Sequence, residues 1–356
     1  MRRIVASNWR GGVAEKVSAC PACGSTIRHA HASSVFDNQR PDDEDLWTYW
    51  RCGSCASLFP DPRPSMDSIG AAYASYYTHH IEAQPGAASA GARRVVSRLV
   101  DGYMNSRFAA AIPDALPLGR LLFAAIEPLR LKLDYHGRHL FLASTGGRRV
   151  LDVGSGNGEF LVRARTLGWH AYGIDPDDAA VSASRDLGLV VCQGFADCAA
   201  PELGGTFDVV TLRHAIEHVP VPADDLRHCL GRLRPGGMLW LAWPNPCGLG
   251  ARLFGSAWRG LEAPRHLCIP SADAMRGMLL AAGFEDPRVL RRGHHARSIS
   301  RESARLAGHR PGWVNRVRAR LGGVVAHIAD IVATVFARGG EELVMVAFAP
   351  TSKRVP

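Results

Sequence analysis

The feature that most constrains the fold of this chain is a glycine-rich turn between a strand pattern and a helix pattern. From Arg149 the sequence reads RVLDVGSGNG, and a predicted helix begins at Glu159. Glycines allow positive φ angles and close approach of a ligand to the backbone, and the first turn of a helix offers free N–H groups. Such a turn is weak evidence by itself, but it predicts a ligand site where the strand enters the helix.

Strand and helix patterns alternate after this turn. Alternation of this kind builds a parallel sheet with helices on both faces. The predicted strands are 148–156, 170–176, 189–194, 207–213, 236–245 and 342–350, and the predicted helices are 159–167, a segment that ends at 187, 222–233 and 271–282. Helical spacing of apolar residues, broken by prolines, also predicts several helices between 94 and 143.

An acidic residue ends the second predicted strand. Asp175 lies 23 positions after Asp152, where a carboxylate can accept hydrogen bonds from both hydroxyls of a ribose. Two cofactors contain such a ribose: a nicotinamide dinucleotide and S-adenosylmethionine. The turn reads G-x-G-x-G after an acid, and not G-x-G-x-x-G. A carboxylate beside the turn would repel a pyrophosphate but suits an ammonium or a sulfonium, so S-adenosylmethionine is favoured.

Four segments, VLDVGSGNGEFL, GIDP, FDVVTLRHAIEHVPVP and LRPGGMLWLAWPN, follow one another in an order that resembles the class I S-adenosylmethionine-dependent methyltransferases. The resemblance is to the bacterial branch that carries an N-terminal four-cysteine zinc module. It covers about 148–286 with high specificity and the cysteine segment more loosely. It implies an α/β, Rossmann-like sheet, mostly parallel with an antiparallel last strand, beside a small zinc-ribbon-like domain and helical additions.

The same resemblance implies where the cofactor binds. The glycines would line its methionine portion with Asp152 near the amino group, and Asp175 would bind the ribose. Phe195 and Ala196 fall where the family contacts adenine, although the acid that the family often has in this stretch is matched here only by Asp197. The implied cofactor-binding residues are Asp152, Gly154, Ser155, Gly156, Gly158, Asp175, Pro176, Phe195, Ala196 and Arg213.

After the fourth predicted strand, His214, Glu217 and His218 spell H-x-x-E-H, the spacing of inverted zinc metallopeptidases. Such a metal site needs a continuous helix, whereas this motif follows a strand and precedes Pro220 and Pro222. Ligands of open parallel sheets bind at the carboxyl ends of the strands, where the motif lies.

In a related group of quinone O-methyltransferases, a Glu-His pair that matches Glu217 and His218 lies at the active site, and some members use a divalent cation there. We therefore predict His218 as the first candidate for a catalytic base, His214 as the second, and Glu217 beside them. The alternative is that one of these histidines caps the helix or binds a carbonyl. A divalent cation at this place is a further candidate cofactor.

A second polar cluster follows the fifth predicted strand. Asn245, Trp258, Arg265 and His266 are predicted to form a substrate wall, with Arg265 available for an anionic group. The alternative is structural, with Arg265 stacked on Trp258.

Two C-x-x-C pairs near the start predict a metal site. Cys20 and Cys23 precede Cys52 and Cys55, with 28 residues between the pairs. Four thiolates complete a closed tetrahedron, so we predict structural zinc, against the alternative of two ordinary reduced turns. A proline-rich tract follows, then a short predicted helix that holds Tyr73, Tyr76 and Tyr77, and a predicted linker over 81–91.

The first twenty residues lack the features of a secretory signal, so we expect a cytoplasmic protein. The net charge of +9 comes with only three lysines, Lys16, Lys132 and Lys353, a skew that looks like codon bias, and nucleic acid is not the expected partner. Ten arginines between 288 and 320 precede an apolar helix over 321–337, which suggests peripheral membrane contact, an active-site lid or a homodimer.

These observations predict four domains and one activity. The domains are a zinc-binding module over 1–80, a linker and helical segment over 81–146, a cofactor-binding core over 147–290, and a basic helical insertion with the final strand over 291–356. The predicted activity is methyl transfer from S-adenosylmethionine to an oxygen or carbon of a small molecule: a sugar, quinone, lipid or secondary-metabolite intermediate. The alternatives are a methyltransferase acting on RNA or protein, and a non-catalytic protein that binds zinc and a nucleoside.

Overall fold

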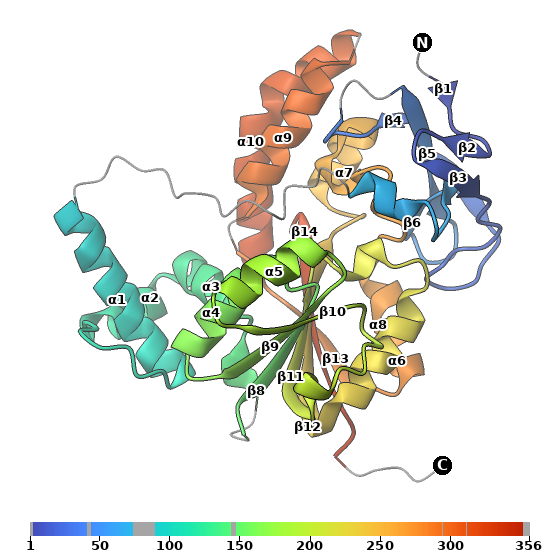
Figure 1. Cartoon of the computed structure of the whole chain (residues 1–356). Helices are drawn as coiled ribbons and strands as arrows, with labels where there is room; N and C mark the ends of the chain where they lie inside the picture. The colour runs from blue at the N-terminus through green and yellow to red at the C-terminus, as the bar shows by residue number, and fades with distance from the viewer. Residues whose placement is uncertain are drawn as a thin grey trace.

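A twisted seven-stranded sheet forms the centre of the protein (Figure 1). The computed structural model of the chain describes residues 3–40, 44–73, 90–143, 147–293, 295–310 and 312–351. The strand order is β10-β9-β8-β11-β12-β14-β13, and only β14 runs antiparallel to its neighbours. This order confirms the predicted sheet with its antiparallel last strand. The strands are β8 (Arg149–Val153), β9 (His170–Asp175), β10 (Val190–Gln193), β11 (Phe207–Arg213), β12 (Leu233–Pro244), β13 (Glu285–Leu290) and β14 (Glu342–Phe348).

Both faces of this sheet are covered by helices, so its central strands are buried over most of their length. Successive residues of β12 alternate between two cores: Leu239 and Leu241 belong to one, and Trp240 belongs to the other. The first core includes residues of α6 (Pro222–Arg232) and α8 (Ala272–Ala282). The second includes residues of α4 (Glu159–Thr166) and α5 (Asp178–Asp186).

Three helices precede the sheet and pack on the second core: α1 (Ala90–Phe108), α2 (Leu118–Ala125) and α3 (Glu127–His136). The helices predicted between 94 and 143 are therefore confirmed. Tyr103 of α1 donates a hydrogen bond of 2.6 Å to Asp134 of α3 and ties the two helices together.

A helical hairpin lies between the last two strands in sequence and rises above the sheet in Figure 1. It consists of α9 (Ala296–Gly308) and α10 (Trp313–Val335). The two helices approach closely because Gly322 has no side chain: a Cβ there would lie 2.5 Å from the Cβ of Ala304.

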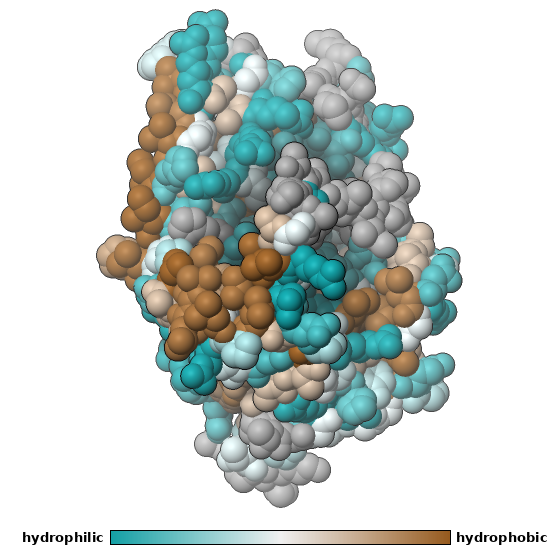
Figure 2. Space-filling model, turned by 90° about the vertical axis from the view of Figure 1, so that its left-hand side faces the viewer, coloured by the Kyte–Doolittle hydropathy of each residue, from teal (hydrophilic) through white to brown (hydrophobic). Residues whose placement is uncertain are grey.

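The outer face of α10 leaves apolar side chains exposed to solvent, among them Trp313, Val324 and Ile331. Figure 2 shows a hydrophobic band running down one edge of the molecule in this view. None of the helices within the described ranges is both long enough and apolar enough to cross a membrane.

The N-terminal residues form a small separate set of strands beside the main sheet (Figure 1). One group consists of β1, β5, β4 and β6, and another of β2, β3 and β7. Their bounds are β1 (Arg3–Ile4), β2 (Asn8–Trp9), β3 (Gly12–Glu15), β4 (Arg28–Phe36), β5 (Asp45–Cys52), β6 (Leu58–Pro60) and β7 (Arg63–Pro64).

This N-terminal module packs tightly on the loops that follow β12. Leu58 and Ile269 exchange backbone hydrogen bonds of 3.0 and 2.7 Å, and the buried Tyr49 hydroxyl donates to the Leu261 carbonyl at 2.7 Å. Residues of the module and of the sheet belong to one apolar core. The module is therefore joined to the rest of the protein by a dry, hydrogen-bonded interface.

The segment after β7 differs in part from the prediction. A 3₁₀ turn, η1 (Ile69–Ala72), comes before Tyr73, the first of the three tyrosines of the predicted helix. Tyr76 and Tyr77 lie outside the described residues, as does the predicted linker up to 89, whereas residues 90 and 91 already belong to α1.

Candidate functional site

The turn between β8 and α4 forms an open cradle of backbone. Gly154, Gly156 and Gly158 all have positive φ angles, of 76°, 53° and 79°. A Cβ on Gly154 would lie 2.8 Å from the Cβ of Ala215, and one on Gly158 would lie 2.5 Å from Leu189. A Cβ on Gly156 would meet nothing within 4 Å. The outer two glycines are thus required by packing, and Gly156 leaves free space where a ligand can approach the backbone.

Asp175 connects the end of β9 to this cradle. One of its carboxylate oxygens accepts a hydrogen bond of 2.7 Å from the Gly156 amide, and the other accepts one of 2.9 Å from the Asp177 amide. Burial raises the pKa of Asp175 above its ordinary value, and these two amides oppose that shift. The side chain therefore lies where the prediction requires it, at the carboxyl end of the second strand and against the glycine turn.

Two buried oxygens beside the cradle lack a hydrogen bond within the described part of the chain: Ser155 Oγ and Asp152 Oδ2. Buried polar atoms are normally paired, so unpaired ones beside an open turn mark a place where a polar ligand or water binds. Together with the open face of Gly156, they fit the polar methionine portion of S-adenosylmethionine.

Asp152 has a partner that the sequence does not reveal. The fully buried carboxylate forms an ion pair with Arg138, which follows α3, and accepts a hydrogen bond of 2.9 Å from Thr211. The guanidinium of Arg138 also stacks on Phe160, with its carbon 3.6 Å from the ring centre. Asp152 is therefore not free to neutralise a ligand ammonium by itself, which qualifies the predicted role. Any ligand at the turn meets the Asp152–Arg138 pair.

The predicted adenine contacts follow β10 and differ in exposure. Phe195 is 54% exposed and offers a ring to a planar ligand, whereas Ala196 is buried at 2%. Pro176 follows Asp175, and its carbonyl accepts a weak hydrogen bond of 3.4 Å from Gln193.

The H-x-x-E-H motif lies at the carboxyl end of β11 on an irregular segment. His214 has a φ of 50°, and a 3₁₀ turn, η5 (Ile216–His218), carries the rest of the motif. The motif is thus not on a continuous α-helix, in agreement with the argument against a metallopeptidase. Glu217 is fully buried, and its carboxylate lies 3.1 Å from Nδ1 of His214.

The two histidines of this motif differ in their electrostatic surroundings. Burial disfavours the charged form of His214, but Glu342 and Glu217 outweigh it and raise the pKa of that ring to about 9. Burial lowers the pKa of His218 below 6.5. His218 is therefore the neutral ring at pH 7. Its Nδ1 lies 2.8 Å from the Tyr73 hydroxyl, which the N-terminal module supplies.

Arg213 and the buried Glu342 are connected through Tyr135. Arg213 Nε donates to the Tyr135 hydroxyl at 2.9 Å, and that hydroxyl donates to Glu342 at 2.5 Å. Glu342 opens β14, beside the end of β12. His295, just before α9, lies 2.8 Å from the same carboxylate. Sequence reasoning missed Tyr135, His295 and Glu342, because no motif marks residues that come together from such distant segments.

The predicted substrate wall is buried, which corrects that prediction. Asn245, Trp258, Arg265 and His266 are each no more than 3% exposed. Arg265 pairs with Asp37 of the N-terminal module, with one N–O distance of 2.9 Å. The Asn245 amide donates to the carbonyls of Arg338 and Gly340. Asn245 and Arg265 thus bind to groups inside the protein, and Arg265 does not present a free charge to a ligand.

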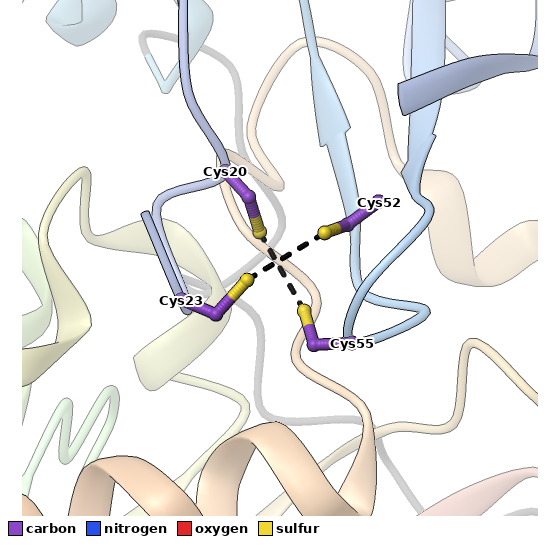
Figure 3. Close-up of side chains that lie close together, drawn as sticks. All are labelled: Cys20, Cys23, Cys52 and Cys55. Carbon is purple, nitrogen blue, oxygen red and sulfur yellow. Dashed lines mark hydrogen bonds between the residues drawn. The ribbon is translucent and has the colours of Figure 1, made fainter. Parts of the chain in front are cut away.

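The four predicted metal-binding cysteines come together in the N-terminal module (Figure 3). The sulfurs of Cys20 and Cys55 are 3.7 Å apart, and those of Cys23 and Cys52 are 3.5 Å apart. A zinc ion with Zn–S bonds of about 2.3 Å places its sulfurs about 3.8 Å apart. The long gap between the two pairs contains β4 and β5, whose pairing brings the cysteines together. The cluster therefore fits one tetrahedral ion.

Comparison with known proteins gives a matching family model, curated relatives and similar solved structures. Residues 120–288 match the family described as a methyltransferase domain. The ubiquinone biosynthesis O-methyltransferase of Xanthomonas oryzae is 36% identical over 150 residues, which cover 40% of this chain and 60% of that protein. The protein of the same name from Aromatoleum aromaticum is 36% identical over 126 residues, which cover 34% of this chain and 52% of that protein.

The chain thus spans between half and two thirds of the length of the curated relatives it matches. Among solved structures, an S-adenosylmethionine-dependent methyltransferase from Archaeoglobus fulgidus is similar, with a TM-score of 0.41 and 19% identity. That match covers 63% of this chain and 93% of the other.

Proposed function

From the premise that this chain carries a class I S-adenosylmethionine-dependent methyltransferase domain, we propose that it methylates an oxygen of a small molecule. The observation that carries the proposal is the open glycine turn, closed on one side by Asp175. The sulfonium of bound S-adenosylmethionine would supply an activated methyl group and a good leaving group. The protein has to bind the cofactor and the acceptor, align the two, and remove a proton from the acceptor.

Cofactor binding is assigned to the turn and its neighbours. The backbone at Gly156 would contact the methionine portion, with the Arg138–Asp152 pair beneath it and the unpaired Ser155 hydroxyl alongside. Asp175 would accept hydrogen bonds from the ribose hydroxyls, and the exposed ring of Phe195 would cover the adenine.

Alignment of the acceptor with the methyl group supplies most of the rate. Holding two reactants in line is worth about 7 to 11 kcal/mol, whereas a general base contributes about 10² to 10⁴ in rate. We assign the base to His218, because its lowered pKa keeps the ring neutral near pH 7. In the tautomer that donates its Nδ1 proton to the Arg265 carbonyl at 3.2 Å, Nε2 carries the lone pair that accepts the proton.

A small-molecule oxygen is favoured as the acceptor because the curated relatives are named as O-methyltransferases of ubiquinone biosynthesis. We assign structural zinc to the four cysteines, whose sulfurs have the spacing of a closed site. In this assignment the zinc module buttresses the loops beside the catalytic residues and takes no part in the chemistry.

Calorimetric titration with S-adenosylmethionine and, separately, with NADH tests the cofactor assignment. We expect micromolar binding of the first and none of the second. Asp175→Asn should weaken binding at least about tenfold, a loss of 1.4 kcal/mol or more, while Asp186→Asn, which changes an exposed acid at the end of α5, should leave it unchanged.

Transfer of labelled methyl tests the acceptor. Separate pools of phenols and hydroquinones, sugars, RNA and protein would be offered to the full chain. Label in the phenol or hydroquinone pool supports the proposal. Label only in RNA or protein overturns the small-molecule assignment, and cofactor binding without transfer to any pool favours the non-catalytic alternative.

A further inference from the structure

Three side chains from distant parts of the chain converge beside β11. His214 follows β11, His295 precedes α9, and Glu342 opens β14. Nε2 of His295 lies 2.8 Å from Glu342 Oε2, and Nε2 of His214 lies 3.4 Å from the same oxygen. All three atoms lie within 4.8 Å of one another.

The shared oxygen of this group lacks a hydrogen bond. Glu342 is fully buried, and its Oε2 has no hydrogen-bond partner among the described residues in spite of the two nearby nitrogens. The two ring nitrogens lie at ion-pair distance from this oxygen, so the three atoms face one small volume. A dication placed between the three atoms would take the place of the proton that the His214 ring otherwise holds beside the carboxylate, and its binding would release that proton.

The outer atoms of the same side chains are already held in place. His214 Nδ1 lies 3.1 Å from the buried Glu217 carboxylate. The second oxygen of Glu342 accepts the Tyr135 hydroxyl at 2.5 Å, and Arg292 Nε lies 3.7 Å from it. Metal-binding histidines and carboxylates usually have such partners, which fix the ring and turn the inner lone pairs toward the ion.

We propose that His214 Nε2, His295 Nε2 and Glu342 Oε2 bind one first-row transition-metal dication. Ligands at about 2.1 Å from an octahedral ion are about 3 Å apart, close to the two measured separations. Two imidazoles and one carboxylate favour iron, cobalt or zinc over magnesium or calcium, which prefer oxygen ligands.

The two histidines form the solvent-facing side of this group. The side chains of His214 and His295 are 34% and 21% exposed, whereas Glu342 lies at the base of the group. An acceptor hydroxyl could bind there and lose its proton more readily. This use of the metal rests on the proposed methyl transfer, but binding of the metal does not.

A neighbouring group, Glu217, His218 and His266, fits an ion less well. Nδ1 of His266 lies 2.7 Å from the Gly260 carbonyl, and its Nε2 is 3.9 Å from Glu217. His218 Nδ1 lies 2.8 Å from the Tyr73 hydroxyl. Glu217 is itself turned toward His214, so this group serves as support for the first one.

Cobalt titration of the full chain tests the site. The chain is first given one equivalent of zinc, which the four cysteines take up in preference to the His–His–Glu group, and Co²⁺ binding is followed by calorimetry and visible absorption. We expect one cobalt per chain with weak bands and no thiolate charge transfer. His295→Ala and Glu342→Gln should each weaken binding more than about 100-fold, and Tyr135→Phe about tenfold. His228→Ala, which removes an exposed histidine of α6, is the matched control and should change nothing.

The proposal is overturned if zinc-loaded protein binds no cobalt, or if His295→Ala binds it as tightly as the unchanged chain. It is also overturned if His266→Ala abolishes binding while His295→Ala does not. Should Glu342→Gln fail to fold, the variant of His295, whose side chain is 21% exposed, decides the matter. Titration of the same samples with S-adenosylmethionine separates the two proposals, because cobalt binding without cofactor binding removes the proposed function and leaves the metal site.

Discussion

The role that a residue can take in this site depends on its partners as much as on its motif. Asp152 stands in the motif position of a cofactor-binding acid, yet its carboxylate is paired with Arg138. Arg265 carries the charge that an anionic substrate would need, yet Asp37 neutralises it. In both cases a side chain far away in sequence determines what the motif residue can do.

Loss of Arg138 should destabilise the fold strongly. Arg138→Gln leaves Asp152 buried without its cation, and breaking a buried ion pair in this way costs about 3 to 5 kcal/mol. The matched control is Arg163→Gln, which removes a pair with Glu159 on the surface of α4, worth about 0.5 kcal/mol or less. Urea unfolding measures both, and equal losses would contradict the assigned burial of the Arg138 pair.

Loss of His218 should lower turnover and leave cofactor affinity unchanged. His218→Ala is expected to reduce kcat by about 10² to 10⁴. Burial holds the pKa of His218 below 6.5 against the opposing effect of Glu217 and Glu262, so the neutral ring persists as the pH falls to that value. The rate of the unchanged enzyme should therefore stay level from pH 8 to about 6.5. A rate that already falls by half at pH 7.5 would assign the base to another group.

At the scale of elements, local sequence patterns carried most of the information about the sheet. The predicted strands that became β8 to β12 and β14, and the helices α4 to α6 and α8, are confirmed. β13 was not predicted, because Pro287 interrupts it and its residues are mostly exposed. Such a sequence is tolerated only in an edge strand, where proline and polar residues do not break a ladder.

The residues of the site also divide into those that local sequence patterns predicted and those that they did not. The glycine turn and Asp175 could be predicted because a strand, a turn and the next strand place them together. The sequence did not predict the positions of Glu342, His295 and Arg138. They come close to the site through the insertion of β14 between β12 and β13 and through the helices before the sheet. Long-range packing, which leaves no local pattern, brings them to the site.

Two glycines with similar backbones allow a comparison between the turn proposed to bind the cofactor and a turn that ends a helix. Gly156 and Gly188 have φ angles of 53° and 69°, and a Cβ on either would meet nothing within 4 Å. Changing either to Ala should destabilise the protein by about 1 kcal/mol, because alanine is strained there. Only Gly156→Ala should weaken S-adenosylmethionine binding, by about tenfold or more, as measured by calorimetry. Equal affinities in the two variants would mean that the cofactor does not approach Gly156.

On the scale of the whole molecule, the N-terminal module and the sheet behave as one packed body. Leu58 and Ile269 join them through the backbone, Tyr49 through its hydroxyl and Arg265 through a buried charge. The module also places Tyr73 against His218. Disorder in the module would therefore reach His218, the proposed base.

Removal of the proposed zinc should lower the melting temperature of the entire chain. Metal binding by four cysteines contributes directly to folding, and for a chain of this size a loss of about 2 kcal/mol lowers Tm by roughly 3 °C. Calorimetric scans with and without a chelator, with zinc content measured on each sample, should show one transition that moves down. A second, unshifted transition would show that the sheet melts independently of the module.

The position of β14 limits which segments of the chain could be exchanged by recombination. The last described strand of the chain lies inside the sheet, between β12 and β13, and its first residue contributes to the site. A recombination event that exchanged only residues 120–288 would separate the interior of the sheet from the strand that completes it. Loss of the residues after 341 would likewise leave the β12 edge of the sheet without its partner strand and remove Glu342.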